Sequence, residues 1–462
     1  MKNYYSTLLL LSLLLLPFFS AAQNTPHISG KVFIDMNTGL VQCDFTLSNL
    51  ESLEKYTILL NKGMNIKHFR DVEGKPIGYH GFYDGNMKGE ALEYLLIGDN
   101  RKLMPLPQTL QVNYIGAFPK YTDSYNLFDF KGFIALNDET LRATEQTKWY
   151  PVIYDTENDR KINQYTYAID VELVGGTSIF LNGSAPKKAQ KASFESKKAV
   201  PLFLFTGNFD FVERKGNYII NSQISSEKAA MVFQNVNMVQ DYLEKSLDRV
   251  FDGKIYLINH KAVNQRRGGW GFNTYPAFAF TGKDMFKNIL TEDGTFDNGS
   301  YRYFAHEFAH NYFGNNVQSG NLFWFWLEAF PEYLSITFAE KVGGKEFLKK
   351  VIESKFRIVK DKSFVPLSKV KEPNEVTDVY RYHMAPLILL SFDFQFGRER
   401  TFEVLKKLLS YADTETLTLD HLRKAAVSSG VSAKDYRDFE AKFIKNKDFK
   451  KHTVRFLEGY TK

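Results

Sequence analysis

The chain has 462 residues, of which 44% are hydrophobic and 24% charged. That composition excludes extensive disorder and predicts a packed protein of two or three domains. Lys and Arg number 59 against 53 Asp and Glu, without a dense basic block, so no nucleic acid is expected as a partner. A single cysteine, Cys43, excludes an intrachain disulfide and a cysteine-based zinc cluster. Its neighbours alternate between polar and apolar, so we expect it to be a small buried side chain.

The N-terminus has the pattern of a secretory signal peptide. Lys2 precedes an apolar stretch over residues 8–19, which small residues at 20–22 follow. The stretch is 12 residues long, well short of the roughly 20 that span a bilayer. We therefore expect residues 1–22 to be removed by cleavage near Ala22 and Gln23. The mature protein is then exported, periplasmic or secreted, without stable membrane insertion.

Strand patterns dominate residues 23–215. Between Tyr165 and Leu173, apolar and polar side chains alternate, which is typical of a half-buried strand. Residues 41–47 repeat this pattern, and turn signals such as the Asn182 and Gly183 pair separate such runs. The sequence predicts an antiparallel β-domain over residues 23–215.

Helical periodicity dominates the second predicted domain, residues 216–450. Apolar residues recur every three or four positions between Val232 and Val250, which indicates one face of a long helix. Strand-like runs follow at 254–259 and 274–280. Further helices are expected near 301–315, 330–341, 345–354, 380–395, 399–411 and 419–428, and the basic segment 442–451 is expected to be a solvated helix end. The predicted fold class is α+β.

An H-E-x-x-H pattern lies in the first of these later helices. Residues four apart share one face of a helix, so His306 and His310 can present two imidazole nitrogens to one Zn²⁺ ion. Glu307 lies beside that position, where its carboxylate can accept a proton from the attacking water. Ser300 is the expected N-cap of the helix.

A catalytic zinc ion takes three protein ligands and keeps one position open. Downstream, Glu328 and Glu332 interrupt an apolar, aromatic run, where a carboxylate is costly unless it is paired or binds a metal. Pro331 belongs in the first turn of a helix, which places Glu328 at the helix start. We expect Glu328 to be the third ligand and Glu332, one turn on, to accept the N–H of a ligating imidazole.

These residues resemble the gluzincin metallopeptidases of the membrane alanyl aminopeptidase type. The segment H-N-Y-F-G-N from His310 resembles the family's H-Q-W-F-G-N, and E-A-F-P-E-Y from Glu328 resembles E-G-F-A-x-Y. Seventeen residues separate His310 from Glu328, one fewer than in the family. The resemblance covers roughly residues 140–430. It implies a thermolysin-like zinc-peptidase catalytic domain, one zinc ion and a peptide substrate.

The same resemblance implies an oxyanion-stabilising tyrosine on a later helix, in a Y-E-K-G-like motif. The segment Y-H-M-A-P-L from Tyr382 matches that motif, with Tyr380 as the alternative. Two residues apart on a helix, the two hydroxyls face different ways. The chain ends soon after this region, so the large C-terminal helical domain of many members is not expected, and the cleft should be more open.

The family's aminopeptidases also carry a G-x-M-E-N motif, whose Glu binds the free amine of the substrate. The corresponding stretch here holds a phenyl ring in place of that carboxylate, at Phe272. We expect the ring to add bulk to the subsite, and the glycine-rich turn to bind peptide backbone as an edge strand does. Candidates for a second amine-binding residue are Glu139 and Glu145. The predicted substrate-binding residues are Gly268, Gly269, Trp270, Gly271 and Phe272.

Taken together, the sequence predicts an exported zinc metallopeptidase that is aminopeptidase-like, with exo- and endopeptidase action both open. Its catalytic residues are Glu307 and Tyr382. The first alternative is a peptide-binding module on the same fold that hydrolyses little, favoured by the loss of the amine-binding Glu. The second is a zinc hydrolase acting on a bond other than a peptide bond.

Overall fold

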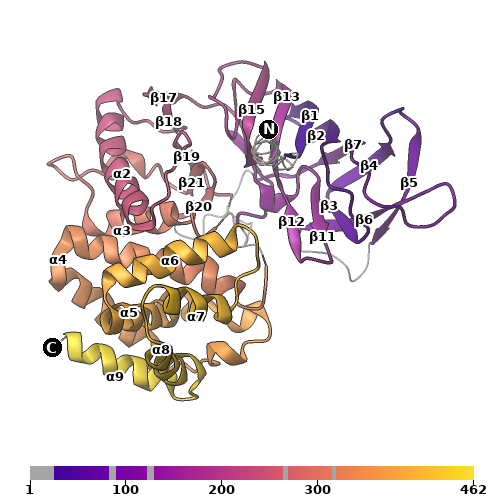
Figure 1. Cartoon of the computed structure of the whole chain (residues 1–462). Coiled ribbons are helices and arrows are strands. Elements are labelled where there is room, and N and C mark those ends of the chain that lie inside the picture. The colour runs from indigo at the N-terminus through magenta and orange to yellow at the C-terminus, as the bar shows by residue number, and fades with distance from the viewer. Residues whose placement is uncertain (1–24, 83–89, 122–128, 264–268, 315–318, 462) are drawn as a thin grey trace, which may run out of the picture.

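A computed structural model describes residues 25–82, 90–121, 129–263, 269–314 and 319–461. The chain folds into a β-rich part, built from the first half of the sequence, and a helical part built from the second half (Figure 1). The predicted signal peptide and Gly268 lie outside the described residues. None of the helices in the described ranges is long and apolar enough to cross a membrane.

The largest sheet has eleven strands, and its neighbours are antiparallel except for the parallel pair β1 and β13. Buried and more exposed side chains alternate along β13, with Tyr165, Tyr167 and Ile169 on the buried face, as the sequence predicts. The order across the sheet is β12 (Arg160–Ile162), β11 (Val152–Asp155), β3 (Tyr56–Asn61), β6 (Ala91–Ile97), β5 (Pro76–Phe82), β4 (Met64–Arg70), β7 (Leu110–Ala117), β2 (Leu40–Ser48), β1 (His27–Asp35), β13 (Gln164–Val174) and β15 (Lys191–Pro201).

Two smaller sheets connect this β-rich part to the helices. The first runs in the order β14 (Ser178–Leu181), β16 (Leu204–Gly207), β10 (Thr140–Ala143), β9 (Ala135–Asn137) and β8 (Lys120–Tyr121). The second runs in the order β17 (Phe211–Arg214), β18 (Asn217–Ile220), β19 (Tyr256–His260), β21 (Ala277–Thr281) and β20 (Trp270–Thr274). The strand expected at 274–280 is observed as β21, but it begins only at Ala277, because Tyr275 and Pro276 form the turn of a hairpin with β20. β20 is an edge strand of this sheet.

The helical part follows the predicted periodicity closely. Its α-helices are α2 (Ser226–Leu247), α3 (Asn298–Ala309), α4 (Phe330–Val359), α5 (Ala385–Phe396), α6 (Arg398–Ala412), α7 (Leu419–Ser428), α8 (Ala433–Phe439) and α9 (Phe449–Thr461). Three π-helical turns are η3 (Phe325–Ala329), η6 (Tyr380–Met384) and η7 (Glu440–Lys445). Short 3₁₀ turns are η2 (Phe286–Asn288), η4 (Leu367–Lys369) and η5 (Pro373–Glu375), and a further one, η1 (Glu145–Thr147), lies in the β-rich part.

The structure corrects two details of the predicted helices and confirms a third. The N-cap of α3 is Asp297, whose carboxylate accepts the N–H of Ser300 at 2.7 Å, so Ser300 is already inside the helix. The two helices expected at 330–341 and 345–354 are confirmed, because α4 consists of two helical stretches separated by a kink at Gly344, where φ is 73°. The basic segment 442–451 is not simply a solvated end, because Phe449 is buried and begins a further helix.

Helix α3 lies between α4 and the β20–β21 hairpin. Phe308 stacks on Phe278 of β21 with ring centroids 3.9 Å apart, and Phe304 is fully buried. An aromatic face of this size fixes α3 firmly against the sheet. The opposite face of the same helix carries the two histidines of the H-E-x-x-H pattern.

Candidate active site

Helix α3 presents both histidines of the motif on one face, as their spacing predicts. His306 lies in the last turn of α3, and His310 caps its C-terminus with φ of −64° and ψ of −17°. Because these angles are still helical, the i, i+4 relation holds. The two imidazole ring centroids lie 4.9 Å apart, with the ring planes at 84°.

The carboxylate of Glu328 lies between the two imidazoles. Its Oε2 atom lies 3.4 Å from Nε2 of His306 and 3.5 Å from Nε2 of His310. This oxygen is buried and makes no hydrogen bond with the described residues. Tetrahedral zinc with bonds of about 2.0–2.2 Å keeps its ligand atoms about 3.3–3.6 Å apart. One ligand atom from each of the three residues lies within 4.8 Å of the others. This donor set fits zinc.

Charge within the cluster favours metal binding. Burial opposes protonation of His306, but the adjacent carboxylates of Glu328 and Glu332 outweigh it and raise the pKa of His306 to about 10. Burial likewise opposes ionisation of Glu328, but the charges of His310 and His306 hold the pKa of this carboxyl well below its usual range. The carboxylates therefore stabilise a positive charge between these side chains. A divalent metal supplies that charge when it replaces the proton on the imidazole.

Glu332 orients His306 from the other side, where the sequence predicts it. Its Oε2 atom lies 3.0 Å from Nδ1 of His306, which leaves Nε2 facing Glu328. Glu332 also accepts from Lys355 at 2.6 Å and forms an ion pair with Arg302. Lys355 further donates to the backbone oxygen of Tyr382 at 2.6 Å. One buried lysine therefore links the metal-binding side of the site to the tyrosine side.

Glu307 lines the same cavity as His306, His310 and Glu328. Only 7% of it is exposed. Burial raises the pKa of the Glu307 carboxyl, and the charges of His306 and His310 oppose the shift. Its backbone oxygen accepts from the side chain of Asn273 at 3.2 Å, which ties α3 to the edge strand β20.

The structure separates the two candidate tyrosines. Tyr382 lines the cavity, and its ring centroid lies 5.8 Å from that of His306. Tyr380 is fully buried instead, packed against Phe364 and Phe449. Burial, followed by the negative charge of Glu328, raises the pKa of the Tyr382 hydroxyl, so it remains a hydrogen-bond donor at neutral pH. Glu328 and Tyr382 both lie on π-helical turns, which are frequent at functional sites.

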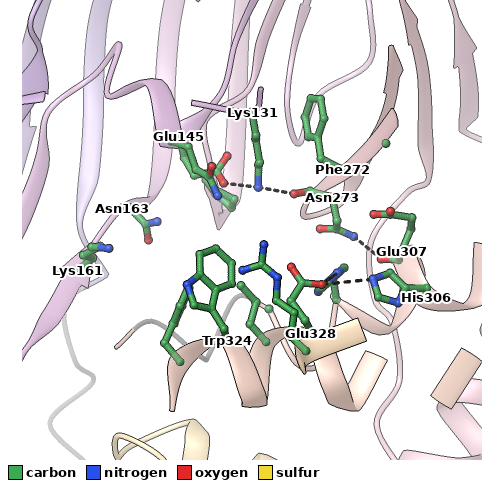
Figure 2. Close-up of a pocket in the computed structure, with 18 of the residues that line it drawn as sticks. Lys131, Glu145, Lys161, Asn163, Phe272, Asn273, His306, Glu307, Trp324 and Glu328 are labelled. Atoms are coloured by element: carbon green, nitrogen blue, oxygen red, sulfur yellow. Dashed lines mark hydrogen bonds and ion pairs between the residues drawn. The ribbon is translucent and has the colours of Figure 1, made fainter. Parts of the chain in front are cut away.

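The cavity is a cleft of about 340 Å³ between the β-rich and helical parts. Figure 2 shows His306, Glu307 and Glu328 at one end, with Lys161 and Asn163 at the opposite end. Glu145 and Lys131 lie on the β-rich side, across from Trp324. Trp324 comes just before η3, and Lys161 comes from β12.

The predicted substrate-binding segment is only partly in the cleft. Gly271 and Phe272 line it, whereas Gly269 and Trp270 do not. The expectation that Phe272 adds bulk to the subsite stays a prediction. Its ring points away from His306 (Figure 2) and packs on Phe203 with centroids 5.8 Å apart.

Gly271 has a packing reason for being glycine. A Cβ atom at this position would lie 1.8 Å from the hydroxyl oxygen of Tyr303 on α3. The close approach of β20 to α3 therefore requires glycine at this position, whatever the strand binds.

Of the two glutamates proposed from the β-domain, the structure brings only Glu145 to the cleft. Its Oε1 atom lies 2.5 Å from Nζ of Lys131, and its Oε2 atom accepts from Thr274 at 2.9 Å. Glu139 lies elsewhere, in an ion pair with Lys261. Sequence reasoning missed Lys131, because no local pattern distinguishes it from a surface lysine.

Sequence reasoning also missed the basic residues along the cleft. The cations that line it are Lys131, Lys148, Lys161 and Arg381. Arg381 is adjacent to Tyr382, so its place beside the site follows once Tyr382 is assigned. Lys148 and Lys161 belong to a different part of the fold and carry no such signal.

Comparison with solved structures shows a shared fold. An M1 zinc metallopeptidase from Deinococcus radiodurans, a mutant bound to a Tyr-Ser-Ala substrate, is 12% identical, with a TM-score of 0.62 over 90% of this chain and 93% of that chain. Native leukotriene A4 hydrolase from Saccharomyces cerevisiae is 13% identical, with a TM-score of 0.63 over 90% of this chain and 67% of that chain. No family model and no curated protein sequence matches. The chain thus has the two-part fold of M1 zinc metallopeptidases.

Proposed function

We propose that this chain is an exported, zinc-dependent metallopeptidase that hydrolyses peptide bonds. One observation carries the proposal. His306, His310 and Glu328 bring their ligand atoms within 4.8 Å of one another, in a cleft that Glu307 and Tyr382 also line. A zinc site, an adjacent carboxylate and a buried hydroxyl are the groups that hydrolysis of an acyl bond needs.

Each protein group has a distinct role in this proposal. Zinc, when bound by His306, His310 and Glu328, supplies an electrophile that acidifies water and polarises a carbonyl. Glu307 accepts the proton of the attacking water and passes it to the leaving amine, a role suited to a carboxylate whose pKa burial raises. The hydroxyl of Tyr382 donates a hydrogen bond to the oxyanion that forms at the carbonyl.

Substrate binding here differs from that in an aminopeptidase, where carboxylates bind the free amine of the substrate. Phe272 occupies the position of one such Glu, and both carboxylate oxygens of Glu145 already have partners in Lys131 and Thr274. A peptide can still pair with the edge strand β20 through its backbone. We infer that the chain cleaves peptides without requiring a free N-terminal amine.

A digestion experiment tests this function. Residues 23–462 are loaded with zinc and incubated with a peptide mixture that holds free and acetylated N-termini, and mass spectrometry locates each cut. We expect cuts that disappear on chelation, return with zinc and occur in both kinds of peptide. Loss of single first residues from free peptides alone would show an amine-dependent aminopeptidase instead.

A peptide-binding module is the second candidate, because the carboxylate expected at position 272 is replaced by the packed ring of Phe272. It predicts that the zinc-loaded protein binds peptides but releases no zinc-dependent products. Export has its own test. N-terminal sequencing of the protein secreted by a bacterial host should give a mature chain that starts near Gln23, and an intact Met1 would refute cleavage.

A further inference from the structure

The cleft beyond the metal-binding residues is rich in positive charge. Lys148, Lys161 and Arg381 line it, in addition to the paired Lys131 and Glu145. Apart from Glu307 and Glu328 at the reaction centre, Glu145 is the carboxylate among the described lining residues. In Figure 2, Lys161 lies at the end of the cleft away from His306.

The charges of Glu145 and Lys131 neutralise one another. Lys131 lies 2.5 Å from Oε1 of Glu145 and also donates to the backbone oxygen of Asn273. Thr274 occupies the other carboxylate oxygen. An incoming ammonium group would have to displace Lys131 from a largely buried ion pair, so this glutamate is a poor anchor for a free amine.

Lys148 and Lys161 add positive charge to the cleft. The ammonium of Lys148 donates to the backbone oxygens of Glu145 and Gln146, at 3.1 and 3.3 Å. Burial, followed by the positive charge of Lys161, lowers the pKa of Lys148 to about 8 despite Glu145. An anion bound near these two lysines would relieve their mutual repulsion.

Arg381 provides an oriented donor beside the reaction centre. Its guanidinium carbon lies 4.1 Å from the ring centroid of Trp324 and 5.3 Å from that of Tyr382. It forms an ion pair with Asp378, a residue whose side chain is 80% exposed, so solvent weakens that pair. The Nε atom of Arg381 is buried and makes no hydrogen bond with the described residues. A guanidinium fixed between aromatic rings with a vacant N–H suits a carboxylate.

We propose that the cleft selects its peptide by a carboxylate, which Arg381 binds within the field of Lys148 and Lys161. The carboxylate comes from an acidic side chain or from the C-terminus of a short peptide. This inference rests on the proposed peptidase function, whose substrate class it specifies.

Matched peptides test the selection. One series carries Glu, Gln or Lys at each position in turn in an otherwise fixed sequence, and each member is made with a free or an amidated C-terminus. We measure kcat/KM for the zinc-loaded enzyme and, separately, the affinity of each peptide for the zinc-loaded Glu307→Gln variant. Glu should exceed Gln by about 10- to 100-fold at one position if the carboxylate is a side chain. If the carboxylate is the C-terminus, amidation should lower kcat/KM by the same factor.

Variants identify the residues that provide the selection. Arg381→Gln should reduce the ratio of acid to amide substrates nearly to one. Because Arg381 neighbours Tyr382, Lys161→Gln is a second variant, expected to lower the same ratio about two- to fivefold. Lys350→Gln removes the same charge at an exposed position of α4 and should leave the ratio unchanged.

The two proposals fail in different ways. Selective binding of acidic peptides without cleavage would support the inference and refute the peptidase function. Cleavage with equal rates for Glu and Gln peptides and for free and amidated C-termini, or with a preference for Lys, would overturn the inference alone. An undiminished ratio in both Arg381→Gln and Lys161→Gln would also overturn it.

Discussion

Lys355→Met should destabilise the protein and disturb both sides of the site at once. Lys355 is 2% exposed, and its ammonium lies 2.6 Å from both Oε1 of Glu332 and the backbone oxygen of Tyr382. Removing one partner of a buried ion pair costs about 3–5 kcal/mol. Arg302 still pairs with Glu332 and offsets part of that, so we expect a loss of about 3 kcal/mol in the free energy of unfolding.

Urea denaturation, followed by circular dichroism on zinc-free protein, measures this loss. The double variant Glu332→Gln, Lys355→Met removes both charges, so it should recover most of the stability. Its zinc affinity should nevertheless be about 10- to 100-fold weaker than wild type, because His306 loses the carboxylate that orients it. A Lys355→Met variant as stable as wild type, or a double variant no more stable than the single one, would refute the reasoning.

Two further predictions concern the other residues of the site. Glu328→Ala should weaken zinc binding much more than Glu332→Ala does, because Glu328 contributes a ligand atom and Glu332 only orients one. Competition with a chelator measures both affinities, and equal losses would reassign the third ligand. Tyr382→Phe should lower kcat about 10²- to 10³-fold. Tyr380→Phe should leave kcat unchanged, because the hydroxyl of Tyr380 is buried away from the cleft. The reverse order would exchange the roles of the two tyrosines.

The residues around the metal site could be predicted because their signals are local. The i, i+4 spacing of His306 and His310 determines a shared helical face, and Pro331 marks the start of α4 after Glu328. The same holds for Leu419–Ser428, where the observed helix has the predicted bounds. Each of these inferences depends only on contacts within a few residues of the chain.

Features that depend on long-range packing were beyond reach. Lys355 meets Glu332 and Tyr382 only because α4 and η6 lie together. The side of β20 to which Phe272 points depends on the register of β20 with β21. The sequence predicts one strand over 274–280, so it gives no information on that register. The proposed domain boundary at residue 215 stays a prediction, although β17 before it pairs with β18 after it.

The most direct test compares zinc-loaded wild type with zinc-loaded Glu307→Gln on the same peptide mixture. Gln keeps the shape of Glu307 but accepts no proton, so zinc content measured by mass spectrometry should be one ion per chain in both proteins. We expect wild type to cleave and the variant to lose about 10²- to 10⁴-fold in rate. Equal cleavage by both proteins, or the absence of bound zinc from wild type, would contradict the account.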